Sequence, residues 1–296
     1  MRDAFSTFHP VVNFIYFTAV ILFSMFFMHP IFLGIAIISA FIYSVVLKGK
    51  KAVKFNLIYM LPLLLLMAVL NPTFNHQGVT ILFYLKNGNP ITLESILYGV
   101  AAACMFITVI LWFSCYNKVM TSDKFIYLFG RIIPSLSLII SMVLRFVPRY
   151  TAQIKVISNA QKCIGRDISQ GNIIRRARNG IKILSIMTTW ALENAIETGD
   201  SMRSRGYGLP KRTSFSLFRL YRRDKAVFAV IMGLIIIVLA GSITGQNTMR
   251  FFQSIKAVKV TVYSAGVYMA YFVLCMLPVF ITIAEEIRWR HIESRI

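Results

Sequence analysis

The side chains that could perform chemistry in this chain of 296 residues are few and scattered. Its four cysteines and four histidines lack the spacing of metal ligands, and three of the cysteines fall inside apolar segments. Glu193, Glu197 and Asp200 follow a helical i, i+4, i+7 spacing, which favours ion pairs with nearby arginines over a catalytic acid cluster. The sequence contains no G-x-x-x-x-G-K-[ST] loop to hold ATP phosphates. We therefore predict a non-catalytic protein with no metal site and no cofactor.

The basic charge is the strongest remaining signal. The formal net charge is +21, and the stretch from Arg145 to Lys225 has 17 Lys and Arg residues against five Asp and Glu, a net of +12. Such an excess is typical of proteins that bind nucleic acid, anionic lipid or an acidic protein partner. Few aromatic residues interleave with the basic stretch, and the chain is rich in membrane-type segments, so we predict no nucleic-acid role.

The elements that position these residues are long apolar blocks. The chain is 57% hydrophobic with a mean hydropathy of +0.68, whereas soluble domains are roughly 45–50% apolar. The blocks span residues 11–28, 31–47, 55–70, 95–115, 226–244 and 260–283. Blocks of this length and composition predict membrane helices. The predicted fold is all-α: a polytopic membrane helical bundle with long cytoplasmic helices.

The distribution of Lys and Arg predicts the orientation. The short loop at residues 48–54 is rich in lysine and should be cytoplasmic, whereas the polar loop at residues 71–92 has one lysine and should be external. The same rule places both termini and the basic stretch in the cytoplasm, and we expect no cleaved signal peptide. Residues 125–148 then have cytoplasmic sequence on both sides, so a single full crossing of the membrane is not possible for them. We expect this segment to be re-entrant, tilted or in the membrane plane, unless one of the earlier apolar blocks does not span the membrane.

These patterns divide the chain into three parts: N-terminal membrane helices (1–148), a cytoplasmic region (149–225), and C-terminal membrane helices with a cytoplasmic tail (226–296). Helical spacing within the middle part predicts two amphipathic helices, separated by a break at Gly171 and Asn172. The first has a mostly apolar stripe made by Tyr150, Ile154, Ile157, Gln161, Ile164 and Ile168. The second is expected to start near residue 181 and to end at Gly206.

The end of the second helix resembles a known motif. The segment Asp200-Ser201-Met202-Arg203-Ser204-Arg205-Gly206-Tyr207-Gly208 is similar to the second coupling motif of the T component of energy-coupling factor (ECF) transporters, a type of ABC transporter. Members of that family have two Ala-Arg-Gly signatures on long cytoplasmic coupling helices. Here Ser204, Arg205 and Gly206 match the second signature, with serine in place of alanine.

The first signature departs from the family pattern. The lead-in at residues 144–148 and 160–161 is similar to that of the family, and the signature itself falls at Cys163, Ile164 and Gly165. The glycine is present, but Ile164 replaces the arginine, and Arg166 follows the glycine. Adjacent helical residues point about 100° apart, so Arg166 cannot simply replace the missing arginine.

The resemblance implies that separate proteins hydrolyse ATP and bind the substrate. It implies two cytoplasmic ABC ATPase subunits that contact residues 163–166 and 204–206, and a separate substrate-binding membrane protein, the S component. It also implies a place in the bacterial plasma membrane and import of a vitamin or a transition-metal ion. The alternative is an autonomous secondary carrier or channel, but such proteins usually place ionisable residues at mid-membrane, and the apolar blocks contain almost none.

Overall fold

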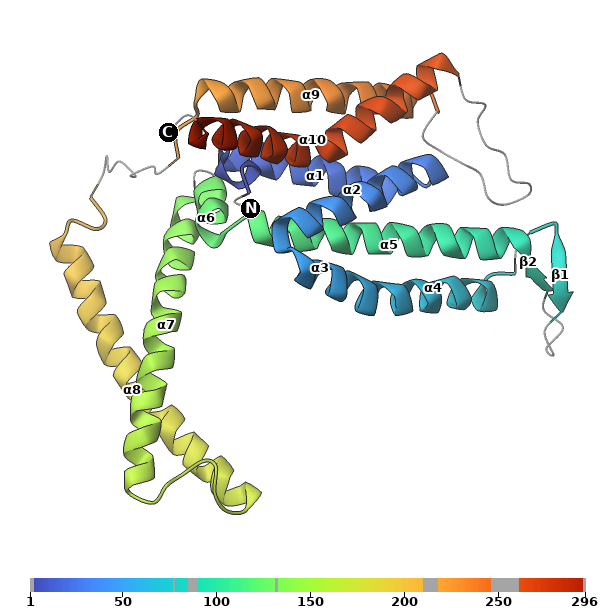
Figure 1. Cartoon of the computed structure of the whole chain (residues 1–296). Helices are drawn as coiled ribbons and strands as arrows, with labels where there is room; N and C mark the ends of the chain where they lie inside the picture. The colour runs from blue at the N-terminus through green and yellow to red at the C-terminus, as the bar shows by residue number, and fades with distance from the viewer. Residues whose placement is uncertain are drawn as a thin grey trace. The chain divides into compact units, whose positions relative to one another are not determined.

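The computed structural model describes residues 3–76, 78–84, 90–130, 133–209, 218–245 and 261–294. The chain divides into two compact units (Figure 1). We call residues 1–125 with 218–296 the membrane unit, and residues 126–217 the α7–α8 unit. Two signals in the sequence, the turn signal Asn87-Gly88-Asn89-Pro90 and the helix stop at Pro210, fall largely or wholly outside the described residues.

The membrane unit consists of helices and one small hairpin (Figure 1). In chain order its elements are the 3₁₀ turn η1 (Phe5–Thr7), α1 (Pro10–Phe26), α2 (Pro30–Lys48), α3 (Lys50–Phe55), the π-helical η2 (Asn56–Met60), α4 (Leu61–Phe74), β1 (Ile81–Tyr84), β2 (Pro90–Thr92), α5 (Leu93–Val119), α9 (Arg222–Ile243) and α10 (Val262–Glu293). The strands pair antiparallel, with Ile81 opposite Thr92. They lie within the loop predicted to be external.

A repeated His-Pro pair starts the first two helices. The imidazole Nδ1 of His9 accepts the Val11 amide at 3.3 Å, and that of His29 accepts the Ile31 amide at 3.3 Å. A proline follows each histidine, where its missing N–H costs no helical hydrogen bond. Burial lowers the pKa of both imidazoles, which favours the neutral form that can accept a hydrogen bond at Nδ1.

The prediction of a polytopic all-α membrane protein is confirmed. Within the described residues, four helices are long and apolar enough to cross a membrane, namely α2, α5, α9 and α10. Two further apolar helices, α1 and the segment Pro62–Phe74 of α4, are shorter. Large apolar side chains on the helix surfaces, such as Val69, Phe106 and Ile236, are about half exposed or more, as expected where a helix faces lipid.

Aromatic rings form the centre of the membrane unit. Phe5, Tyr16, Phe17, Tyr43 and Trp112 are fully buried, and they meet mostly edge to face or tilted, with centroids 5.0 to 6.4 Å apart. The Tyr16 hydroxyl donates to the carbonyl oxygen of Cys275 at 3.1 Å. The cluster therefore joins the N-terminal turn, α1, α2, α5 and α10.

A glycine allows α9 and α10 to pack closely. A Cβ placed on Gly241 would lie 2.6 Å from Cγ1 of Val267, whereas one on Gly233, two turns earlier on the same helix, would meet nothing within 4 Å. We expect Gly241→Leu to lower the free energy of unfolding by about 1–3 kcal/mol through overpacking, measured by denaturant titration in detergent. Gly233→Leu is the matched control. Equal stabilities for the two variants would contradict the close packing.

The α7–α8 unit contains two long helices. After α6 (Ser122–Gly130), α7 (Pro134–Cys163) runs for 30 residues and α8 (Ile173–Ser204) for 32. The helix α7 continues through Pro148, so the boundary predicted between residues 148 and 149 lies inside one helix. A proline removes one hydrogen bond of a helix, and the remaining bonds hold this long helix together. The second helix starts at Ile173, earlier than expected, because the side chain of Asn172 caps it.

The two helices meet through part of the predicted apolar stripe. Ile157 of α7 packs with Ile183 and Met187 of α8, and all three are buried. Tyr150 and Trp190 meet edge to face with centroids 5.4 Å apart. Other stripe residues stay on the surface: Ile154 is 43% exposed and Ile164 is 60% exposed. Among the described residues the two helices share this small core, and many of their other side chains are exposed.

Candidate functional site

The second signature lies at a glycine-terminated helix end. The amide of Tyr207 donates to the Met202 carbonyl at 2.9 Å, and the amide of Gly206 donates to the Arg203 carbonyl at 2.9 Å. This pair of bonds is a Schellman motif. It requires a left-handed residue after the cap, and Gly206 supplies it with φ of +79°. Arg205 is therefore the cap residue of α8, on the last position before the chain turns away.

The first signature has the same backbone geometry. The amide of Arg166 donates to the Gln161 carbonyl at 2.9 Å, and that of Gly165 to the Lys162 carbonyl at 3.0 Å. Gly165 has φ of +77°. Ile164 is the cap residue of α7 with φ −98° and ψ 19°, close to the −84° and 9° of Arg205. The two tripeptides are thus superposable helix ends in which only the side chains differ.

This equivalence fixes the backbone position of each predicted residue. Ile164 occupies the position of Arg205, and Arg166 occupies that of Tyr207, one residue beyond the glycine. The side chains of Cys163, Arg166, Ser204 and Arg205 are exposed, as is Ile164. The first helix end therefore presents an apolar side chain where the second presents a guanidinium, and Arg166 leaves from a different point of the turn.

Hydrogen bonds hold the loop after the first signature against α8. Arg176 Nε donates to the Ile168 carbonyl at 2.7 Å, and the buried Asn179 donates to the Asp167 carbonyl at 3.0 Å. The Asp167 carboxylate accepts from the hydroxyl and amide of Ser169 at 2.6 and 3.0 Å, and these bonds lower its pKa. The first signature is thus fixed beside the first two turns of α8, and Arg176 has a structural partner.

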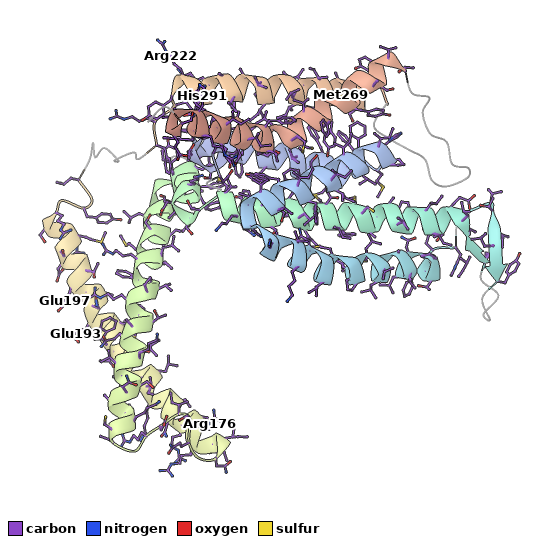
Figure 2. The ribbon with its side chains drawn as sticks, in the orientation of Figure 1. Arg176, Glu193, Glu197, Arg222, Met269 and His291 are labelled. Carbon is purple, nitrogen blue, oxygen red and sulfur yellow. The ribbon has the colours of Figure 1, made fainter. Side chains whose placement is uncertain are left out.

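The predicted ion pairs of the acidic cluster do not form among the described residues. Glu193, Glu197 and Asp200 are exposed on α8, and the described residues place no basic group within 4.0 Å of them. Figure 2 shows Glu193 and Glu197 one turn apart, with Arg176 near the start of the same helix. Two arginines of the unit have other contacts: Arg149 stacks over Trp190 with its guanidinium carbon 5.6 Å from the ring centroid, and Arg176 donates to the Ile168 carbonyl. These acids remain available to a partner.

An open groove of about 990 Å³ lies between α7 and α8. Arg145 and Arg149, four residues apart on α7, line it together with Arg205 and Glu197 of α8. In the sequence, Arg145 marked the start of the basic stretch and lay in the lead-in to the first signature, but it was not predicted to be a site residue. The i, i+4 spacing of the two α7 arginines was the available signal that they share one helix face. The groove links the second signature to a cationic face of α7.

Helices that can cross a membrane, together with two long exposed helices that end at glycine-capped signatures, define a polytopic membrane protein with a separate helical unit. Residues 4–217 match the family model CbiQ, described as a cobalt transport protein. The chain belongs to this family, and the matched region contains α1 to α8 and both signatures.

The names of curated relatives confirm the predicted resemblance to the T component of ECF transporters. The chain is similar to proteins named energy-coupling factor transporter transmembrane protein EcfT from Leuconostoc gelidum (33% identity over 36% of this chain and 40% of the relative), Lactobacillus helveticus (35%, over 36% and 39%) and Staphylococcus aureus (34%, over 37% and 41%). The aligned segments span about two fifths of the length of these relatives.

Proposed function

We propose that the chain is the transmembrane coupling subunit of an ATP-driven importer of the ECF type, in a bacterial plasma membrane. Two ABC ATPase subunits bind the α7–α8 unit on the cytoplasmic side, and an S component binds the substrate. The S component selects the solute, a vitamin or a transition-metal ion. The observation that supports this proposal most is the duplicated helix end at Gly165 and Gly206.

The spacing of the two helix ends suits two partner subunits. The first signature is held beside Arg176 at the start of α8, and the second ends the same helix at Ser204. At 1.5 Å per residue, this separation is about 40 Å. A single small ligand cannot bridge two such points, whereas two copies of similar ATPases can each receive one end. A rigid helix between them transmits the movement of one ATPase relative to the other.

The two ends bind differently in this proposal. Arg205 offers a planar fork of donors that matches a carboxylate or backbone carbonyls in a groove of one ATPase. Ile164, 60% exposed, offers an apolar contact to the other. The turn at Gly206 lets the chain leave the helix sharply, so the partner backbone can approach the cap residue. The asymmetry predicts that the second end contributes more binding free energy.

An apolar ridge on α8 suits the S component. Ile181, Leu184, Leu192 and Ile196 are 62 to 68% exposed, and their spacing places them within about a third of the helix circumference. An unpartnered ridge of this kind on an amphipathic helix is a typical docking face for an apolar partner. We propose that the membrane-embedded S component covers it.

Affinity purification of the tagged chain from its native membrane tests the proposal. We expect two ATPases with phosphate-binding loops and one small polytopic membrane protein to co-elute in near-stoichiometric amounts, with ATPase activity in the eluate. A polytopic membrane protein of unrelated fold with the same tag is the control. Solute transport by the isolated chain in liposomes would instead support the carrier alternative.

A further inference from the structure

The α7–α8 unit joins the membrane unit at two points of the chain, and a cation lies at each. The unit begins after Phe125 and ends before Phe218. Lys124 lies one residue before the first junction, and Arg223 lies on the first turn of α9 after the second. Both cations belong to the membrane unit, and both reach the same short stretch near the N-terminus.

Lys124 is buried against this stretch. Its side chain is 7% exposed, and its ammonium donates to the carbonyl oxygen of Ser6 and, at 3.0 Å, to that of Val119. With the amide of Asn13 oriented to satisfy both of its ends, Oδ1 accepts from Lys124 at 3.1 Å and Nδ2 donates to the Phe5 carbonyl at 3.1 Å. The start of α6 is therefore tied to η1 by one desolvated ammonium.

Arg223 reaches the next two residues. Its guanidinium donates to Thr7 Oγ1 at 3.0 Å and lies 4.4 Å from the centroid of the Phe8 ring, a cation–π contact. The same group pairs with Glu285 of α10 at 2.9 Å. The following residue, Asp224, is 2% exposed and accepts the Tyr221 amide at 3.0 Å, which caps α9. The second junction is thus fastened to residues adjacent to Ser6.

The stretch is itself fixed to the bundle through Asp3. The Asp3 carboxylate accepts from the amides of Phe5 and Ser6 at 3.3 and 3.1 Å, which holds the 3₁₀ turn. It also accepts from the hydroxyls of Tyr43 on α2 and Thr282 on α10 at 3.5 and 3.4 Å. Residues 3–8 therefore contact α2 and α10 on one side and both junction cations on the other.

We propose that residues 3–8 form a clasp that anchors both ends of the α7–α8 unit to one point of the membrane bundle, with Lys124 and Arg223 as positioning residues. Because the two junctions hold adjacent residues of one turn, they move together with respect to the bundle. The clasp limits the rotation of the α7–α8 unit relative to the membrane unit. Its part in passing an ATP-driven movement to the bundle rests on the proposed function.

The range of this rotation is measured on the full chain in lipid nanodiscs, as the distribution of distances between two spin labels in pulsed electron paramagnetic resonance. One label is at Lys155→Cys, an exposed position of α7 outside both signatures, and the other at Lys50→Cys on α3. The background is Cys104→Ala and Cys163→Ala, because Cys104 is half-buried and Cys163 is exposed. Arg223→Gln removes the half-exposed cation. We expect the label distance distribution to broaden about twofold, since hinge freedom at one junction increases.

Arg290→Gln is the matched control, because Arg290 is an exposed arginine whose pair to Glu286 has the same 2.9 Å length but does not involve residues 3–8. Distance distributions of equal width for Arg223→Gln and Arg290→Gln would overturn the clasp.

In a second arm of the experiment, Mg-ATP and vanadate are added to the complex that co-purifies with the chain. We expect a shift of the distance in the unsubstituted labelled chain and in Arg290→Gln, and a shift at most half as large in Arg223→Gln, about a twofold loss. A labelled chain that does not respond to nucleotide would contradict the proposed function while leaving the width comparison to decide the clasp.

Discussion

Arg205→Ala is expected to weaken binding of the ATPase pair to the chain about 30-fold, which corresponds to about 2 kcal/mol. Arg205 is exposed at the cap position of α8, and none of the ion pairs among the described residues involves it. Its removal therefore costs the fold little, and the loss appears in the complex. The measurement is the dissociation constant between the chain in nanodiscs and the ATPases identified by co-purification, with ATP-dependent uptake as a second readout.

Arg203→Ala is the control for this prediction. Arg203 is also exposed in the last turn of α8, but it lies two residues earlier and points about 200° away around the helix. We expect its substitution to change the dissociation constant less than about threefold. If both variants bind the ATPases as tightly as the unsubstituted chain, Arg205 is only a solvated charge near the helix terminus, and the coupling assignment fails.

Lys124→Met is expected to lower the free energy of unfolding of the membrane unit by about 3 kcal/mol. Burial lowers the pKa of Lys124, and the nearby Asp3 carboxylate acts in the opposite direction. Burial likewise raises the pKa of Asp3, partly offset by the hydrogen bonds it accepts. Methionine keeps the length of the side chain but leaves the carbonyls of Ser6 and Val119 without their donor. Denaturant titration of the full chain in detergent measures the change.

Lys118→Met provides the comparison, since Lys118 is exposed in the last turn of α5. A change of about 0.5 kcal/mol or less is expected there. Similar stabilities for the Lys118 and Lys124 variants would mean that water, and not the ammonium, satisfies the carbonyls of the N-terminal turn. The prediction concerns stability alone and holds whatever the chain transports.

Local features of the sequence were sufficient for the fold class and for the end of α8, but not for the end of α7, which lies at Cys163 and not at the predicted break at Gly171 and Asn172. Apolar blocks predict membrane helices because an unpaired backbone group in lipid is too costly for any other spanning segment. Gly165 and Gly206 mark the ends of α7 and α8 because a left-handed residue is most easily a glycine. The candidate site at residues 163–166 and 204–206 followed from these signals and from the family resemblance, and its partner contacts remain a prediction.

The sequence alone determined that the chain is an all-α membrane protein and that α8 ends at Gly206, since hydrophobicity and backbone dihedral preferences act over a few residues. Only the tertiary structure decided that Ile164 takes the backbone position of Arg205 and that the acids of α8 have no arginine partner among the described residues. It also decided that Lys124 and Arg223 contact the same N-terminal turn, at Ser6 and Thr7. Contacts between residues more than a hundred positions apart leave no periodicity in the sequence, because they depend on how whole helices pack.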